Sequence, residues 1–333
     1  MTDPLRIVSL GGGTGLSSLL NGIKQYVRPA ENHPGLDITA IVAVSDDGGS
    51  SGRLRREFDV LPPGDIRNCM VALSEDGALL SRLFQYRFAA GHGLKGHSFG
   101  NLFLTALTNI TGDFPEAVLR SCEVLNIAGR IYPATAANVT IEAVLEDGRA
   151  VAGESRISRS KRRIRSIRMT PANARPLKEA LAAIEAADLI TFGPGSLFTS
   201  VIPNLLVKGI PKAIQKSPAL KAYYVNLMSQ PGETIDFRAS DHVQAIRDHS
   251  LPDLIDCAVV STTRISPAMR RRYAEQNASP VETDYDRLEA MGLQIVEGDL
   301  LQKGAKVRHN PAAVGSVTLG LARLGRMQRM LRQ

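Results

Sequence analysis

The chain has 333 residues, of which 44% are hydrophobic and 22% charged, a composition typical of a globular protein with a large core. Its apolar runs are only of strand length, so we expect no membrane-spanning helix. The first strand already begins at Leu5, which leaves no room for a signal peptide. Three widely spaced cysteines favour reduced thiols and a cytoplasmic location. The net charge of +7 suits anionic ligands, but the 5% aromatic content argues against a nucleic-acid partner.

The opening stretch predicts a seat for a phosphate group. Residues 5–10 form an apolar run typical of a buried strand, and a glycine loop and a helical pattern from Leu16 follow it. Amide groups and the helix dipole at such a junction favour an anion. The loop lacks the third glycine of a dinucleotide fingerprint and the lysine of a Walker A loop, so a plain turn remains an alternative. The candidate contacts are Gly11, Gly12, Gly13, Thr14 and Gly15.

A second apolar strand, residues 38–44, ends in a loop that carries two carboxylates. Asp46 and Asp47 are candidate ligands for Mg²⁺ bridging a pyrophosphate, and ordinary turn chemistry is the alternative for both. Asp65 is a further candidate ligand beside Asp46. Asp65 is also expected to cap a helix that covers residues 70–73. Further candidate contacts in this region are Gly48, Gly49, Ser50, Ser51 and Asn68.

The middle of the chain predicts helices and then a β-hairpin. Residues 96–100 match the serine-hydrolase elbow, but no strand precedes them, so we interpret Ser98 as a helix N-cap. Strands over 139–144 and 151–157 flank Asp147-Gly148, a turn signal. We expect an insertion over 138–170 that includes a basic run of Arg159, Lys161, Arg162, Arg163, Arg165 and Arg168.

The α/β alternation resumes after the insertion. A strand over 189–192 leads into a third glycine loop, and further strands are expected near 221–226, 258–261 and 293–297. The last helix begins at Asn310-Pro311, where asparagine is a good N-cap. The basic run and the arginines of this last helix are interpreted as solvated faces, with docking of a protein partner left open. The third loop offers Gly193, Pro194, Gly195 and Ser196 as contacts, and the helix arginines are Arg323, Arg326, Arg329 and Arg332.

Strands alternating with helices predict one α/β domain over 1–333, with a Rossmann-like, mostly parallel sheet and helices on both faces. Ligands of such sheets bind outside the carboxyl ends of the strands. We therefore expect the three loops to meet in one cleft at one sheet edge.

Six motifs, taken together and in order, resemble the YvcK proteins, also called gluconeogenesis factors. These proteins belong to a superfamily with CofD, the 2-phospho-L-lactate transferase of deazaflavin cofactor synthesis. The resemblance spans nearly the whole chain. The motifs are Gly-Gly-Gly-Thr-Gly-Leu-Ser at 11–17, Asp-Asp-Gly-Gly-Ser-Ser-Gly-Arg at 46–53, Pro-Pro-Gly-Asp-Ile-Arg-Asn at 62–68, Gly-His-Ser-Phe-Gly-Asn at 96–101, Gly-Pro-Gly-Ser-Leu-Phe-Thr-Ser at 193–200 and Arg-His-Asn at 308–310.

The resemblance implies a CofD-like fold and a cytoplasmic regulator that binds UDP-N-acetylglucosamine. It also implies links to cell shape, peptidoglycan synthesis and growth on gluconeogenic carbon sources. Position by position, it assigns the glycine loops and Asp46 to the nucleotide cleft, and Asn226, Tyr273 and Arg308 to nucleotide-sugar contacts. No cofactor is required under this interpretation, and a homo-oligomer is expected.

Two hypotheses about function follow. The first is a UDP-sugar-binding regulator that catalyses nothing, because no convincing nucleophile–base pair is present. The second is a CofD-like transferase, in which Mg²⁺ held by Asp46 and Asp65 would help move a phospholactyl-type group from a nucleotide diphosphate donor. The first is preferred. An NAD-dependent oxidoreductase is disfavoured, since the third glycine and an acidic residue for the ribose are both missing.

Overall fold

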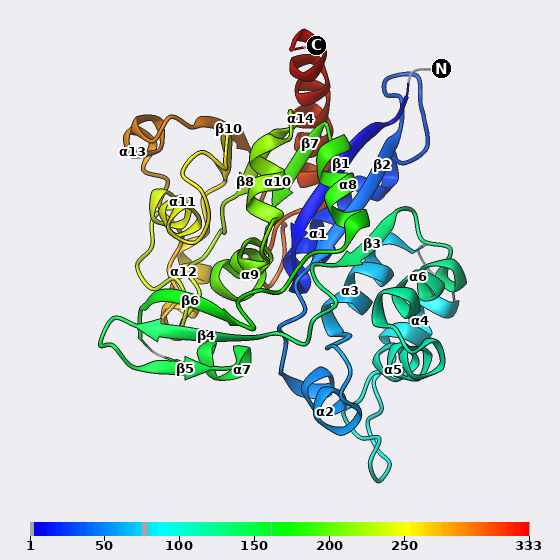
Figure 1. Cartoon of the computed structure of the whole chain (residues 1–333). Helices are drawn as coiled ribbons and strands as arrows, with labels where there is room; N and C mark the ends of the chain where they lie inside the picture. The colour runs from blue at the N-terminus through cyan, green and yellow to red at the C-terminus, as the bar shows by residue number, and fades with distance from the viewer. Residues whose placement is uncertain (1–2, 75–78, 161, 333) are drawn as a thin grey trace.

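The computed structural model describes residues 3–74, 79–160 and 162–332, and its centre is a seven-stranded parallel sheet (Figure 1). The strand order is β10-β9-β8-β7-β1-β2-β3, and every neighbouring pair is parallel. The sheet therefore has one edge at which all strands end. The strands are β1 (Leu5–Gly11), β2 (Leu36–Val42), β3 (Arg130–Pro133), β7 (Leu189–Phe192), β8 (Leu220–Tyr224), β9 (Cys257–Ser261) and β10 (Gln294–Gly298).

Helices cover both faces of the sheet, which buries its central strands on two sides. α1, α3 and α14 pack together on one face, and α8, α9 and α10 cover the other (Figure 1). The helices are α1 (Gly13–Ile23), α2 (Gly49–Phe58), α3 (Gly64–Leu73), α4 (Leu79–Gln85), α5 (Phe99–Thr111), α6 (Phe114–Leu125), α7 (Glu154–Ile157), α8 (Lys178–Ala186), α9 (Ile202–Leu206), α10 (Ile210–Lys216), α11 (Ala239–Asp248), α12 (Pro267–Ala274), α13 (Tyr285–Ala290) and α14 (Pro311–Leu331). None of the described helices is long and apolar enough to cross a membrane.

The predicted hairpin is confirmed, but it belongs to a three-stranded antiparallel sheet. β4 (Thr140–Leu145) pairs with β5 (Ala150–Ala152) around the Asp147-Gly148 turn. β6 (Ile164–Thr170) pairs with the other edge of β4. The strand predicted over 151–157 was therefore too long, since α7 occupies its second half.

The interpretation of the basic run as a solvated face is confirmed, because every arginine of the run is exposed. Its later part is β6, in which Ile164, Ile167 and Met169 are buried while Arg165 and Arg168 are exposed. Arg162 pairs with Asp147 at 3.2 Å, and Arg163 pairs with Asp236 at 3.0 Å. Lys161 lies outside the described residues. β3 was not predicted at all, because its four residues carry no clear periodic pattern.

The arginines of α14 differ from the prediction, because two of them, Arg326 and Arg329, bind a buried carboxylate. Asp188, fully buried before β7, accepts hydrogen bonds from Arg326 Nε at 2.7 Å and Arg326 Nη2 at 2.6 Å. Arg329 Nη1 lies 3.7 Å from the same carboxylate. These two side chains are therefore not part of a free docking surface.

Candidate functional site

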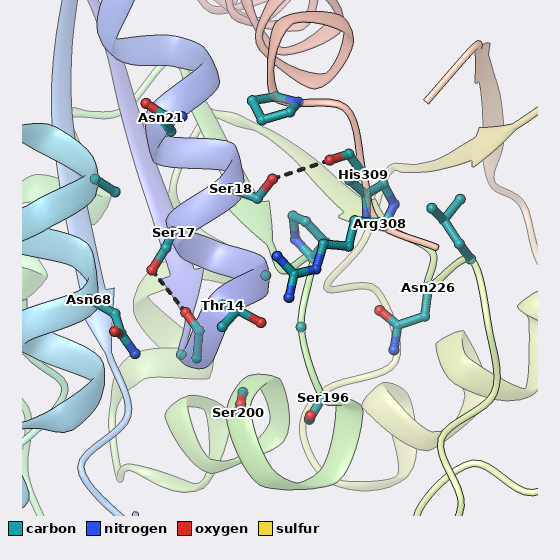
Figure 2. Close-up of a pocket in the computed structure, with 18 of the residues that line it drawn as sticks. Thr14, Ser17, Ser18, Asn21, Asn68, Ser196, Ser200, Asn226, Arg308 and His309 are labelled. Atoms are coloured by element: carbon teal, nitrogen blue, oxygen red, sulfur yellow. Dashed lines mark hydrogen bonds between the residues drawn. The ribbon is translucent and has the colours of Figure 1, made fainter. Parts of the chain in front are cut away.

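A cavity of about 670 Å³ opens at the carboxyl edge of the parallel sheet. Its size falls within the range of ligand-binding pockets in other proteins. Six segments line it: the glycine loop with α1, residues 67–72 of α3, Gln85 at the end of α4, the loop after β7, the loop after β8, and the segment before α14. Figure 2 shows Arg308 reaching into the space between Thr14 and Asn226, with Ser196 beyond it. Only two of the three predicted glycine loops line this cavity.

The first glycine loop offers backbone amides to the cavity. α1 begins at Gly13, and its N-cap, Gly12, has no side chain to satisfy the first amide groups of the helix. Gly13 has a φ of +62°, which a glycine adopts without strain. The Gly13 amide is taken by the Asp65 carboxylate, so the next amides of the first turn remain for a ligand. An unfilled helix N-terminus of this kind favours an anion.

The first and third loops approach so closely that only glycine fits between them. A Cβ placed on Gly15 would lie 2.3 Å from the carbonyl oxygen of Pro194 and 2.7 Å from Gly195 Cα. Asn204, in α9, fastens the same contact, because its Nδ2 donates to the Gly11 carbonyl at 3.1 Å and to the Ser200 carbonyl at 2.8 Å. The two loops therefore form one continuous wall.

The opposite wall holds polar atoms without hydrogen-bond partners. Asn226 Nδ2, Gln230 Oε1 and His309 Nε2 are each hidden from solvent and have no partner among the described residues. Gln230 uses its Nε2 to bind Ser196 Oγ at 2.8 Å, which fixes its orientation. Each unpaired buried polar atom costs about 1–3 kcal/mol. A ligand that supplied hydroxyl or amide groups here would recover part of that cost.

Arg308 and His309 differ in charge although they are neighbours. Burial lowers the pKa of His309 to about 4, so its ring is neutral at pH 7. The ring hydrogen-bonds to the backbone of Val225, which leaves Nε2 as the unpartnered nitrogen. The exposed Arg308 guanidinium has no carboxylate within salt-bridge distance among the described residues and is free to meet an anion. Ser18 Oγ donates to the His309 carbonyl at 3.3 Å and ties this segment to α1 (Figure 2).

Asp46 and Asp65 lie close enough to repel each other, but neither lines the cavity. Burial, together with the charge of Asp46, raises the pKa of Asp65 to about 6. Burial also raises the pKa of Asp46 from its ordinary value. Asp46 Oδ1 accepts from the Gly48 amide at 2.7 Å, which is the turn chemistry considered above.

The prediction that Asp65 caps α3 was wrong. The N-cap position belongs to Pro63, and Asp65 lies inside the first turn of the helix. Its carboxylate instead accepts from the Gly13 amide of another loop. No group of three or more His, Cys, Asp or Glu side chains suited to a metal occurs within residues 3–74, 79–160 and 162–332. Asp46 and Asp65 would therefore fit Mg²⁺ only if phosphate oxygens completed the coordination.

The predicted site residues separate into two groups. The cavity is lined by Gly12, Gly13, Thr14, Gly15, Asn68, Pro194, Gly195, Ser196, Asn226 and Arg308. It is not lined by Gly11, Asp46, Gly48, Gly49, Ser50, Ser51, Asp65, Gly193 or Tyr273. The second loop packs against the start of α3 instead, where a Cβ on Gly64 would lie 2.3 Å from Ser51 Oγ. Tyr273 acts from outside the wall, since its hydroxyl accepts from the amide of Val307 at 3.0 Å.

Sequence reasoning missed several residues of the wall. Ser17, Ser18 and Asn21 share the exposed stripe of α1, and its helical spacing was the signal that pointed to them. Arg67 and His309 stand inside motifs that were recognised, but neither was given a role. Ser200 likewise ends the recognised motif at 193–200 and was given no role. Gln230 and Gln302 offered no local signal, and tertiary packing alone brings these two to the cavity.

Ser98 is an N-cap, as predicted, and not a nucleophile. Its Oγ accepts from the Asn101 amide at 3.3 Å at the start of α5. One serine–histidine pair does occur, between Ser50 Oγ and His97 Nδ1 at 2.9 Å, but both residues are buried and neither lines the cavity. The described walls of the cavity therefore present no activated nucleophile of the serine–histidine kind.

Comparison with known proteins shows the family. The model of the family described as 2-phospho-L-lactate transferase CofD matches residues 7–301. A gluconeogenesis factor of Bacillus subtilis strain 168 is 47% identical over 317 residues, which covers 95% of this chain and 98% of that protein. A gluconeogenesis factor of Halalkalibacterium halodurans is 46% identical over 314 residues, covering 94% and 95%.

A solved structure agrees with the computed fold. The crystal structure of a member of the UPF0052 family from Bacillus halodurans has a TM-score of 0.90 and 45% identity, and it covers 96% of this chain and 100% of that one. The α/β fold and the resemblance inferred from the six motifs are thereby confirmed. The chain belongs to the CofD family and, within it, to the gluconeogenesis factors, or YvcK proteins.

Proposed function

We propose that the protein is a cytoplasmic regulator that binds a UDP-sugar, UDP-N-acetylglucosamine above all, and acts in cell shape, peptidoglycan synthesis and gluconeogenic growth. The observation that carries the proposal is the combination of two kinds of wall in one cavity. An uncapped helix N-terminus and Arg308 suit a diphosphate. Unpartnered atoms of Asn226, Gln230 and His309 suit a neutral group with many hydroxyl or amide functions.

The two walls lie in an order that fits a nucleotide sugar. Asn226 and His309 lie beside β8 and the start of α14, while the amides of Thr14 and Gly15 lie at the end of β1 (Figure 2). A diphosphate over the glycine loop would place its neutral substituent next to the unpartnered atoms. The absence of a serine–histidine pair on the described walls supports a role in binding rather than in hydrolysis.

Isothermal titration calorimetry with UDP-N-acetylglucosamine tests the proposal directly. We expect saturable binding that UDP competes away and that Arg308→Ala weakens at least ten-fold, about 1.4 kcal/mol. Arg332→Ala, an exposed arginine at the end of the chain, is the matched control and should bind like the wild type. A wild-type protein that releases no heat with any UDP-sugar would refute the proposal.

A variant at Tyr273 distinguishes residues that contact the ligand from those that only hold the cavity wall in place. Its hydroxyl holds Val307, one residue before Arg308, and the residue does not line the cavity. Tyr273→Phe removes this hydrogen bond and keeps the ring. We expect it to weaken UDP-sugar binding less than Arg308→Ala does, because the loss acts only through the position of Arg308.

A transferase is the second candidate, because the matching family model describes a 2-phospho-L-lactate transferase. Asp46 and Asp65 would hold Mg²⁺, which would neutralise charge on a donor pyrophosphate. The cavity's own residues would bind and orient the donor. The test is consumption of a nucleotide-linked donor with Mg²⁺ present. Turnover that Asp65→Asn abolishes would support this function over the regulator.

A further inference from the structure

One arginine of the cavity has no role in the site described so far. Arg67 lines the cavity from α3, and a narrow slot holds its side chain. A Cβ on Gly100 would lie 2.7 Å from Arg67 Cγ and 2.8 Å from the Phe84 carbonyl, so glycine is what admits the stem. Arg67 Nε also faces Asn101 Oδ1 at 3.4 Å. The guanidinium is therefore oriented before any ligand arrives.

The charge of Arg67 is balanced only in part, by the Asp65 carboxylate beyond salt-bridge distance. No carboxylate lies within salt-bridge distance of it among the described residues, in contrast to Arg326 and Arg329, which share Asp188. Its two terminal nitrogens have no hydrogen-bond partner among those residues and are not sealed from solvent. Burial and the like charge of Arg87 lower the pKa of Arg67, and the Asp65 carboxylate opposes them only in part. A desolvated cation with a second cation beside it is stabilised when an anion binds.

The position of Arg67 separates it from the wall that holds Asn226. α3 packs against β2 and β3, whereas Asn226 follows β8. β1 and β7 lie between these strands, so β2 and β8 are three strand spacings apart, roughly 14 Å. Asn68 lies on the far side of α1 from Asn226 and Arg308 in Figure 2. The cavity thus has a cationic end at α3 in addition to the anion seat over α1.

We propose that Arg67 forms a second oxyanion subsite, which takes a carboxylate or phosphate group while a nucleotide diphosphate occupies the glycine loop. The planar guanidinium matches both groups with paired hydrogen bonds. This inference rests on the proposed function for its first ligand. With the sugar next to Asn226 as proposed above, the oxyanion comes from a separate small anion, such as a sugar phosphate, bound beside the nucleotide. An acidic sugar of the nucleotide itself would reach Arg67 only if the nucleotide bound in the reverse direction.

Two titrations distinguish these sources. UDP-glucuronate and UDP-glucose differ in a carboxylate that replaces a hydroxymethyl group, and calorimetry compares their Kd values. If the nucleotide sugar supplies the anion, the wild type should bind UDP-glucuronate at least ten-fold more tightly, and Arg67→Gln should bring the ratio close to one. If a separate anion supplies it, glucose 6-phosphate or inorganic phosphate should bind the UDP-saturated wild type and fail to bind UDP-saturated Arg67→Gln.

Controls keep the outcomes distinct. Arg308→Gln should weaken both UDP-sugars equally and leave their ratio unchanged. Arg67→Lys keeps the positive charge but not the paired hydrogen bonds of the guanidinium, so it should give an intermediate ratio of the two Kd values. It also replaces Arg67→Gln if urea unfolding shows that the glutamine variant does not fold. A wild type that discriminates neither UDP-sugar and binds neither free anion overturns the proposal.

Two further outcomes would distinguish a failure of the oxyanion subsite from a failure of the UDP-sugar function. If Arg67→Gln weakens UDP itself as strongly as it weakens UDP-glucuronate, Arg67 belongs to the diphosphate seat and the second subsite does not exist. If the wild type binds no UDP compound but binds glucose 6-phosphate through Arg67, the UDP-sugar function fails while the oxyanion subsite stands.

Discussion

The contact between the two glycine loops predicts a large effect of adding one methyl group at Gly15. In Gly15→Ala, the new Cβ would lie 2.3 Å from the Pro194 carbonyl oxygen and 2.6 Å from its carbon, where ordinary contact begins near 3.4 Å. Both atoms are backbone, so no side chain can rotate away. The two loops must therefore separate by about 1 Å. Overpacking of this kind costs about 1–3 kcal/mol.

Helix propensity acts in the opposite direction, which makes the prediction sharper. Alanine is about 1 kcal/mol more favourable than glycine inside a helix, and Gly15 belongs to the first turn of α1. Gly320→Ala, in α14, is the matched control, since nothing lies within 4 Å of its added Cβ. We expect urea unfolding to show Gly320→Ala equal to or more stable than the wild type and Gly15→Ala less stable than both.

Ligand binding supplies the second measurement. A separation of about 1 Å misplaces the amides of Thr14 and Gly15 against Gly195, so the Kd for UDP-N-acetylglucosamine should rise at least ten-fold. Gly320→Ala should leave this Kd unchanged. If Gly15→Ala unfolds at the same urea concentration as Gly320→Ala and binds the ligand equally well, the two loops do not form the wall inferred above.

Three further predictions concern stability. Asp188→Ala leaves Arg326 and Arg329 without their buried partner and should lower the free energy of unfolding by about 3–5 kcal/mol. The control Arg332→Ala should change it by less than about 0.5 kcal/mol. Equal effects of the two variants in urea unfolding would contradict a structural role for Asp188. Burial raises the pKa of Glu233 to about 7, so its protonated carboxyl stabilises the fold below about pH 4.5, and this contribution is lost as the pH rises through 7. The difference in unfolding free energy between the wild type and Glu233→Gln should therefore change by about 3 kcal/mol between pH 4.5 and pH 8. Parallel pH profiles of the two proteins would refute this. Asn310 Oδ1 accepts from the Ala312 amide at 3.0 Å, so Asn310→Ala should lower the stability of the fold by about 1 kcal/mol. Asn310→Ser restores a cap and should recover most of this loss, as thermal unfolding would show.

Local features of the fold were predictable because the interactions that form them span only a few residues. Ser98 and Asn310 bond amides three and two residues away, and such caps can be recognised from the sequence alone. The Asp147-Gly148 turn determines the pairing of β4 and β5 in the same way. Unbroken apolar runs of strand length, such as the one over 189–192, predict strands buried on both faces of a parallel sheet.

The candidate site was predictable only in part, because spatial neighbours in it are distant in sequence. Apolar runs place strands in a sheet but do not set their order, and that order decides which loops share an edge. The second glycine loop illustrates the limit: it is rich in glycine like the first, yet it packs against the start of α3 and none of its residues lines the cavity. Asp65 is likewise of a residue type favoured at helix N-caps, but its carboxylate accepts from the Gly13 amide of another loop.

The sequence by itself determined the α/β class, the glycine loop ahead of α1, the local caps and the family. Tertiary structure alone decided the strand order, the joining of Gly15 to Pro194, and the pairing of Asp188 with Arg326, which is 138 residues away. It also decided that Arg67 has no carboxylate partner among the described residues. The physical reason is that backbone periodicity and caps are short-range, whereas the charge balance and shape of a cavity depend on every element packed around it.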